Sequence, residues 1–117
     1  QNLLAGGQIA SRGMEASSTQ AGDGNMSMIT QLNDQLTAPQ SPANNIASAN
    51  QSGDFNESTI SQTGALLDAS LTQSGDFNES TITQSGTDNT ASVTQSTDNN
   101  VSFVTQSGTG NMATVTQ

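Results

Sequence analysis

Apolar residues are sparse along this chain, and in its second half they recur with a strict period. From Ile60 onward an aliphatic residue stands at every eleventh position. The alternate positions around it carry a fixed set of side chains, which in the first copy are Asn56, Ser58, Ile60 and Gln62. A period of two places these side chains on one face of a β-strand. The inward apolar set is then Ile60, Leu71, Ile82, Val93, Val104 and Val115.

Glutamine, glycine and asparagine follow the same spacing and define an 11-residue repeat. Its form is Q-x-G-x-x-N-x-[SA]-x-[IVL]-x-Q, with six consecutive copies between Gln51 and Gln117. Leu67 replaces the asparagine once, and Thr97 replaces the glycine once. The four residues after each glutamine predict a bend, where glycine permits a positive φ. The expected bend glycines are Gly22, Gly53, Gly64, Gly75, Gly86 and Gly108.

A strand with a single apolar residue must stack on others to be stable. QSGDFNESTISQ (residues 51–62) recurs two repeats later as QSGDFNESTITQ (residues 73–84). A rung of two facing strands, one in each of two sheets, uses two repeats and brings these stretches into register. The sequence therefore predicts an all-β fold, a β-solenoid with two facing parallel sheets. We expect about five 22-residue rungs of two strands, which stack into cross-β fibres with strands about 4.8 Å apart.

The predicted interior is largely polar. Asparagine and glutamine are costly to bury unless their amides are hydrogen-bonded. In an in-register stack, each amide can bond to the same amide one rung above and below. We therefore expect an inward ladder that comprises Asn56, Gln62, Gln73, Asn78, Gln84, Asn89, Gln95, Asn100, Gln106, Asn111 and Gln117.

The repeat weakens toward the N-terminus. We expect a tail at residues 1–8, degenerate repeats at 9–50 and regular repeats at 51–117. Within the degenerate part, the stretches 14–20 and 34–40 fit the inward pattern, although Pro39 and Pro42 interrupt this region. Ten strands are expected in total.

Composition narrows the possible functions. The net charge is −9, the hydrophobic fraction is 30%, and Arg12 is the only basic residue. Such a composition is typical of disorder, and only the repeat argues against it. Phosphate binding needs lysine and arginine, so we expect no nucleic-acid partner. No apolar run is long enough for a membrane span. Without histidine, cysteine or lysine, and with its acids in repeating positions, the chain is not expected to be an enzyme or to need a cofactor.

The repeat resembles the curlin repeat of curli amyloid subunits in bacterial biofilms. The likeness is carried by QSGTGNMATVTQ (residues 106–117), QSGTDNTASVTQ (84–95) and the two stretches quoted above. It implies an exported protein that assembles with itself outside the cell into fibres on the cell surface. Its expected partners are its own copies, a nucleator subunit and export machinery. Because the chain begins at Gln1, we expect that a signal peptide has been removed.

Several alternatives remain open. The chain could be a minor nucleator of the same fibre rather than its major subunit. Outward threonines, such as Thr81 and Thr83, resemble the flat faces of ice-binding β-solenoids. A monomeric adhesin or a disordered secreted chain forms a third class. Asp54, Asp76 and Asp98 share one bend position and should form an acid column, which we interpret as solvated charges against aggregation, with Ca²⁺ binding as the alternative. No metal site is predicted.

Overall fold

The computed structural model describes residues 3–9, 14–32 and 44–117, and these residues form ten β-strands and no helix. All strand pairs are parallel. Sheet A contains, in order, β1 (Leu3–Ile9), β3 (Met26–Leu32), β5 (Glu57–Ala65), β7 (Glu79–Thr87) and β9 (Val101–Thr109). Sheet B contains β2 (Glu15–Ala21), β4 (Ile46–Ser52), β6 (Asp68–Ser74), β8 (Thr90–Gln95) and β10 (Met112–Thr116).

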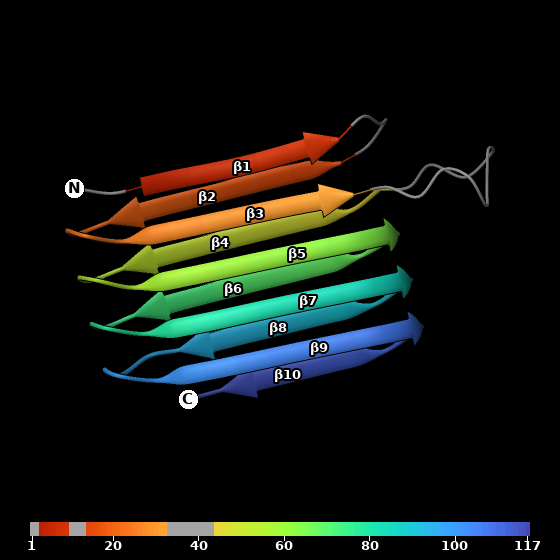
Figure 1. Cartoon of the computed structure of the whole chain (residues 1–117). Coiled ribbons are helices and arrows are strands. Elements are labelled where there is room, and N and C mark those ends of the chain that lie inside the picture. The colour runs from red at the N-terminus through yellow and green to blue at the C-terminus, as the bar shows by residue number, and fades with distance from the viewer. Residues whose placement is uncertain (1–2, 10–13, 33–43) are drawn as a thin grey trace.

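The chain alternates between the two sheets, so that it coils in one direction from β1 and β2 to β9 and β10 (Figure 1). Each strand lies beside the strand two places away in the sequence. The predicted all-β β-solenoid with two facing parallel sheets is therefore confirmed. Within the described residues, no helix is long and apolar enough to cross a membrane.

The solenoid has about three regular turns, and the prediction of five equal 22-residue rungs is not matched. Glu57 pairs with Glu79, and Glu79 with Val101, so that each of these steps spans two repeats. Toward the N-terminus the steps differ: Met26 pairs with Glu57 and Leu3 pairs with Met26, and both steps are longer than two repeats. The prediction applied the 22-residue period of the regular repeats to the N-terminal strands as well. These strands are aligned in register, but the sequence distance between them differs from that period.

The N-terminal segment also differs from expectation. Residues 3–8, for which we expected a tail, lie in β1, where Gln8 pairs with Gln31. This strand could not be recognised from the sequence because Gly6 stands at the position that is aliphatic in the other repeats. Backbone pairing with β3 requires no particular side chain, so the strand forms without the full motif. The strand expected at 34–40 lies outside the described residues.

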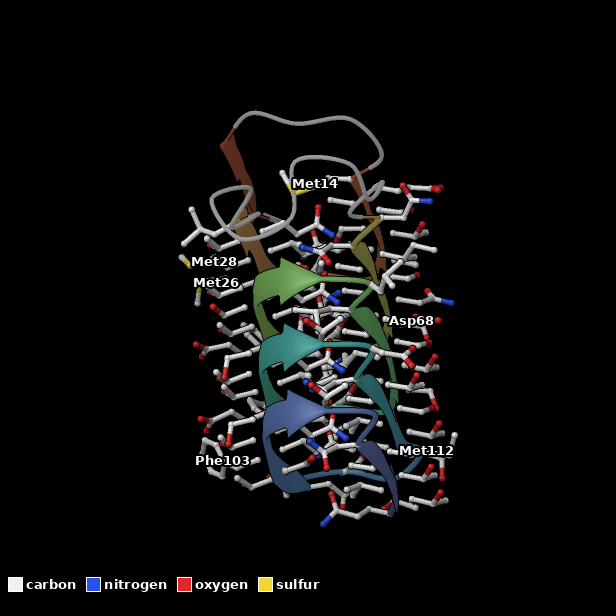
Figure 2. All side chains as sticks on the ribbon, turned by 90° about the vertical axis from the view of Figure 1, so that its right-hand side faces the viewer. Met14, Met26, Met28, Asp68, Phe103 and Met112 are labelled. Carbon is white, nitrogen blue, oxygen red and sulfur yellow. The ribbon has the colours of Figure 1, made fainter. Side chains whose placement is uncertain are left out.

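The core is a single layer of side chains between the sheets. Aliphatic residues occupy its centre, with Ile60 and Ile82 fully buried from sheet A and Leu71 and Val93 from sheet B. Small residues such as Ala69 and Ser80 lie beside them and are also buried. From β2 to β10 the opposite face of each strand points toward solvent, as Figure 2 shows for Phe103 on sheet A and for Asp68 and Met112 on sheet B. The alternation of buried and exposed positions follows the sequence period of two.

Candidate functional site

The inward glutamines form one hydrogen-bonded ladder in each sheet. In sheet A, Gln62 Nε2 donates to Gln84 Oε1, and Gln84 Nε2 donates to Gln106 Oε1. In sheet B the ladder runs in the same sense from Gln20 to Gln117. The donor–acceptor distances lie between 2.8 and 3.0 Å throughout. Every amide nitrogen therefore points toward the C-terminal end of the stack, which gives the solenoid a chemical polarity.

The same glutamines also join the two sheets. Gln84 Nε2 donates to the backbone carbonyl of Asp68 at 2.9 Å, and Gln73 Nε2 donates to that of Glu57 at 3.0 Å. In both cases the acceptor is the first residue of a strand in the opposite sheet. An amide NH₂ has two protons, and the ladder uses one while the opposite sheet takes the other. This second role was not predicted, because sequence spacing gives only the stacking direction.

The inward asparagines behave differently from the predicted amide-to-amide ladder. Asn56 Oδ1 accepts the backbone N–H of Asn78 at 3.0 Å, and Asn56 Nδ2 donates to the carbonyls of Ser52 and Gly75. The expectation of stacked asparagine amides is thus wrong, because the shorter side chain reaches the bend backbone instead. The asparagines tie each bend to the bend of the next turn. Where Leu67 replaces asparagine, its N–H is still bound by Asn45 Oδ1, at 3.0 Å.

Burial of the predicted inward residues depends on their place in the stack. All six predicted aliphatic side chains point into the layer, and only Val115, on the last strand, is half-buried. Among the amides, Asn100 is half-buried and Asn111 and Gln117 are exposed. The other predicted ladder residues are buried: Asn56, Gln62, Gln73, Asn78, Gln84, Asn89, Gln95 and Gln106. The exposed members belong to the last turn, on which no further turn of the described chain stacks.

The bends use two residues with positive φ. All six predicted bend glycines adopt it, and a Cβ on Gly53 would lie 2.1 Å from the Gly75 carbonyl oxygen, so the close stacking itself requires glycine. The residue before the asparagine position, which Leu67 fills once, is also left-handed: Phe55, Leu66, Phe77, Asp88 and Asn99 have φ between 57° and 60°. The Phe55 and Phe77 rings stack with centroids 5.2 Å apart. Sequence reasoning missed these positions, since phenylalanine and leucine do not signal a left-handed backbone.

The predicted acid column is present as a geometric feature. Asp54 N–H donates to Asp76 Oδ1, and Asp76 N–H donates to Asp98 Oδ1, each at 2.8 Å. The column also includes Asp23, whose N–H donates to Asp54 Oδ1. The sequence predicted solvated charges in this column, with Ca²⁺ binding as the alternative, and gave no sign of these backbone hydrogen bonds. Each of the three predicted carboxylates accepts a backbone proton from the preceding turn, which offsets part of the repulsion between like charges.

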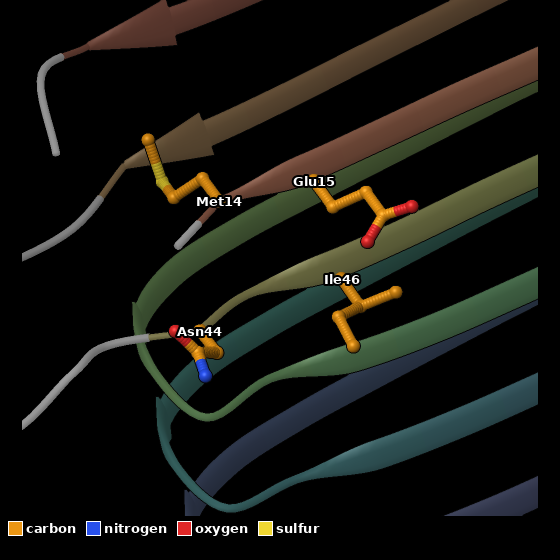
Figure 3. A pocket seen from close by; sticks show the side chains of 4 residues that line it. All are labelled: Met14, Glu15, Asn44 and Ile46. Atoms are coloured by element: carbon orange, nitrogen blue, oxygen red, sulfur yellow. The ribbon is translucent and has the colours of Figure 1, made fainter. Parts of the chain in front are cut away.

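Other candidate sites are weak. Within the described residues, no group of three or more acidic side chains is placed to hold a metal ion. A shallow depression of about 390 Å³ is lined by Met14, Glu15, Asn44 and Ile46 (Figure 3). Its two polar lining side chains, Glu15 and Asn44, are both exposed. The main candidate site is therefore the last turn of the stack.

The last turn presents open edges. β9 pairs only with β7 and β10 only with β8 within the described residues, so each has a backbone edge without a neighbouring strand. The ladders end there as well. In this part of the chain Gln106 Nε2 donates to the Thr90 carbonyl and Gln117 Nε2 to the Val101 carbonyl, whereas the ladder glutamines above them also donate to the next amide. The exposed turn thus offers side-chain and backbone groups that a further turn would pair.

Comparison with known proteins identifies the repeat. The family model described as the curlin associated repeat matches residues 42–73, 67–96 and 86–117. No curated protein and no solved structure matches the chain. The three matches overlap and together span residues 42–117, which is more than half of the sequence. They coincide with the turns in which the glutamine ladders follow a 22-residue step, and the chain therefore belongs to the curlin-repeat family.

Proposed function

We propose that this chain is a structural subunit of extracellular amyloid fibres in a bacterial biofilm matrix. The observation that carries the proposal is the in-register stack itself, in which two parallel sheets and two polarised glutamine ladders repeat through the turns that match the family model. A second copy would continue both sheets and supply the missing acceptors. Unpaired strand edges favour such addition, because every added strand satisfies a row of N–H and C=O groups. Export to the cell surface and cooperation with a nucleator subunit belong to the same proposal.

The principal test is assembly of the purified chain. We expect thioflavin-positive fibres whose diffraction shows a spacing of about 4.8 Å along the fibre axis. Removal of residues 107–117 should slow elongation from preformed seeds, because it deletes β10 and the last three residues of β9 and leaves half a turn. A chain that stays monomeric at high concentration and gives no such reflection would contradict the proposal.

Ice binding is the second candidate, and one feature favours it. On the outer face of sheet B, Thr72, Thr94 and Thr116 stand in register. The neighbouring outer column carries Ser48, Ser70, Ser92 and Thr114. The column after it is interrupted, however, because it combines Ile46, Asp68, Thr90 and Met112. A thermal-hysteresis assay on the same sample separates the two functions, since a fibre subunit should show no hysteresis. A nucleator would instead accelerate assembly of another subunit at substoichiometric amounts.

A further inference from the structure

One joint between successive bends lacks the side-chain ties that close the others on its edge of the solenoid. On this edge the asparagine position is filled, turn by turn, by Asn45, Leu67, Asn89 and Asn111. Asn45 Oδ1 accepts the Leu67 N–H at 3.0 Å, and Asn45 Nδ2 donates to the Gly64 carbonyl at 2.9 Å. Asn89 Oδ1 accepts the Asn111 N–H in the same way, at 2.9 Å. Because the leucine side chain can neither accept nor donate a hydrogen bond, the step from bend 64–67 to bend 86–89 has no such tie, and we call it the Leu67 joint.

The missing ties concern groups that are removed from water. Asn89 is fully buried, and its N–H lacks the side-chain acceptor that the Asn78 and Asn100 N–H groups find one turn earlier. Leu67 is also fully buried, but it lies outside the aliphatic cluster of the core. A buried N–H that loses its acceptor costs free energy comparable to that of a hydrogen bond. The Leu67 joint is therefore less stable than its neighbours on the same edge.

The residue before Leu67 weakens the same edge. Leu66 has a φ of 57°, and its side chain is 44% exposed. The next two turns carry Asp88 and Gly110 at this position, and both residue types adopt a left-handed backbone more readily than leucine does. Leu66 is thus strained without burying its side chain. Segments that are strained and weakly bonded are the ones that open locally in a folded protein.

The opposite edge of the Leu67 joint is reinforced. There the Phe55 and Phe77 rings stack with centroids 5.2 Å apart, and Asn56 Oδ1 accepts the Asn78 N–H at 3.0 Å. The chain itself also crosses the joint on this edge, because β6 continues through residues 75–78 into β7 (Figure 1). One edge of the joint is therefore held by an aromatic stack, an asparagine tie and the covalent chain, while the other relies on backbone pairing.

We propose that the Leu67 joint is a built-in opening point, at which the Leu67 edge separates while the Phe55–Phe77 edge stays closed. The movement is confined to the bends, because Gln62 Nε2 still donates to Gln84 Oε1 beside them, at 2.9 Å. The stack thus yields at one place while the glutamine ladders keep its register. Both turns have further turns on either side, so the opening point operates in the single chain as well as in a fibre.

Residue-resolved amide hydrogen exchange of the full chain tests the opening directly. The protection factor of Asn89 should be lower than that of Asn78 by about tenfold or more, because Asn78 is similarly buried but has its acceptor. Leu67→Asn supplies the missing acceptor and should raise the Asn89 protection factor about tenfold. Leu67→Met is the matched control, since it keeps the size without an amide, and it should change this factor by less than about twofold. Equal protection of Asn89 and Asn78 in the unmodified chain, or equal effects of the two variants, would overturn the proposal.

A disulfide across the joint gives an independent test, because the sequence has no cysteine. Ala65 and Thr87 are register partners at the Leu67 edge, and adjacent strands bring their Cα atoms within bonding range. The oxidised Ala65→Cys, Thr87→Cys variant locks this edge and should raise the Asn89 protection factor about tenfold or more. The control links Thr59→Cys to Thr81→Cys in the middle of the same two strands and should leave this factor within about twofold. An equal gain from both disulfides would show that the strands separate as a whole and would overturn the opening point. Neither measurement requires fibres, so failure of the chain to assemble would refute only the proposed function.

Discussion

Replacement of Gln84 by leucine tests the glutamine ladder at its most connected position. Gln84 is 1% exposed. Its Nε2 donates to Gln106 Oε1, to the Asp68 carbonyl and to the Asn89 carbonyl, and its Oε1 accepts from Gln62 Nε2. Leucine has a similar size but leaves at least three buried groups without this partner: the Gln62 amide, the Gln106 oxygen and the Asp68 carbonyl.

The magnitude follows from these losses. A buried polar group without a partner costs about 1–3 kcal/mol, and the apolar leucine side chain regains about 1–2 kcal/mol. We expect a net loss of about 3 kcal/mol in the free energy of unfolding. With a urea dependence of about 2 kcal/mol per M, the unfolding midpoint should fall by about 1.5 M. The assay is urea unfolding followed by circular dichroism, at protein concentrations where the midpoint no longer depends on concentration.

The matched control is Thr83→Ser, because Thr83 faces outward and its register neighbour is already Ser61. This change should alter the free energy of unfolding by less than about 0.5 kcal/mol. Gln84→Glu adds a second comparison, since it keeps the shape but removes the donor that three oxygens share, and it should destabilise at least as much as leucine. If Gln84→Leu and Thr83→Ser had equal midpoints, the ladder would contribute nothing to stability and the reasoning would fail.

Two further predictions concern the bends. Gly53→Ala should lower the unfolding temperature by far more than Gly110→Ala, although both backbones have a positive φ. A Cβ at Gly53 would lie 2.1 Å from the Gly75 carbonyl oxygen, whereas a Cβ at Gly110 would have no atom within 4 Å. Similar melting curves of the two variants would show that the turns do not stack this closely. Leu66→Gly should stabilise the protein by about 1 kcal/mol, although it removes an apolar side chain. Leu66 is exposed and has a φ of 57°, and glycine adopts this left-handed backbone without strain. A lower melting temperature of the variant would show that the Leu66 side chain contributes packing energy despite its exposure.

The sequence was sufficient for the features that depend on period. Alternation around Ile60 predicted the strands, and the 22-residue offset predicted which strands are neighbours. Both predictions succeed because the faces of a strand alternate strictly and a parallel in-register sheet repeats its side chains in columns. The same reasoning placed Gln84 inward and aligned Asp54 with Asp76.

The sequence could not predict which hydrogen-bond partners the inward side chains find, because these depend on side-chain length and on the three-dimensional geometry. Gln84 and Asn56 carry the same functional group, and only the geometry shows that the longer side chain reaches the opposite sheet while the shorter one reaches the bend. Phenylalanine does not favour a left-handed backbone, so the positive φ of Phe77 results from the stacking of successive bends. Strand β1 was missed because it pairs with β3 through the backbone without carrying the full motif.

The unequal turns show what the fold requires of the sequence. The two longest steps, from Met26 to Glu57 in sheet A and from Glu15 to Ile46 in sheet B, both cross the connection between β3 and β4. One longer connection therefore accounts for both. On either side of it the columns stay aligned, because Gln31 still pairs with Gln62 and Gln20 with Gln51. Lengthening a surface connection costs little, whereas a shift of one residue would turn every inward side chain outward. The solenoid thus depends on register rather than on period, which explains why parallel pairing extends over five strands in each sheet while the family model begins to match only at residue 42.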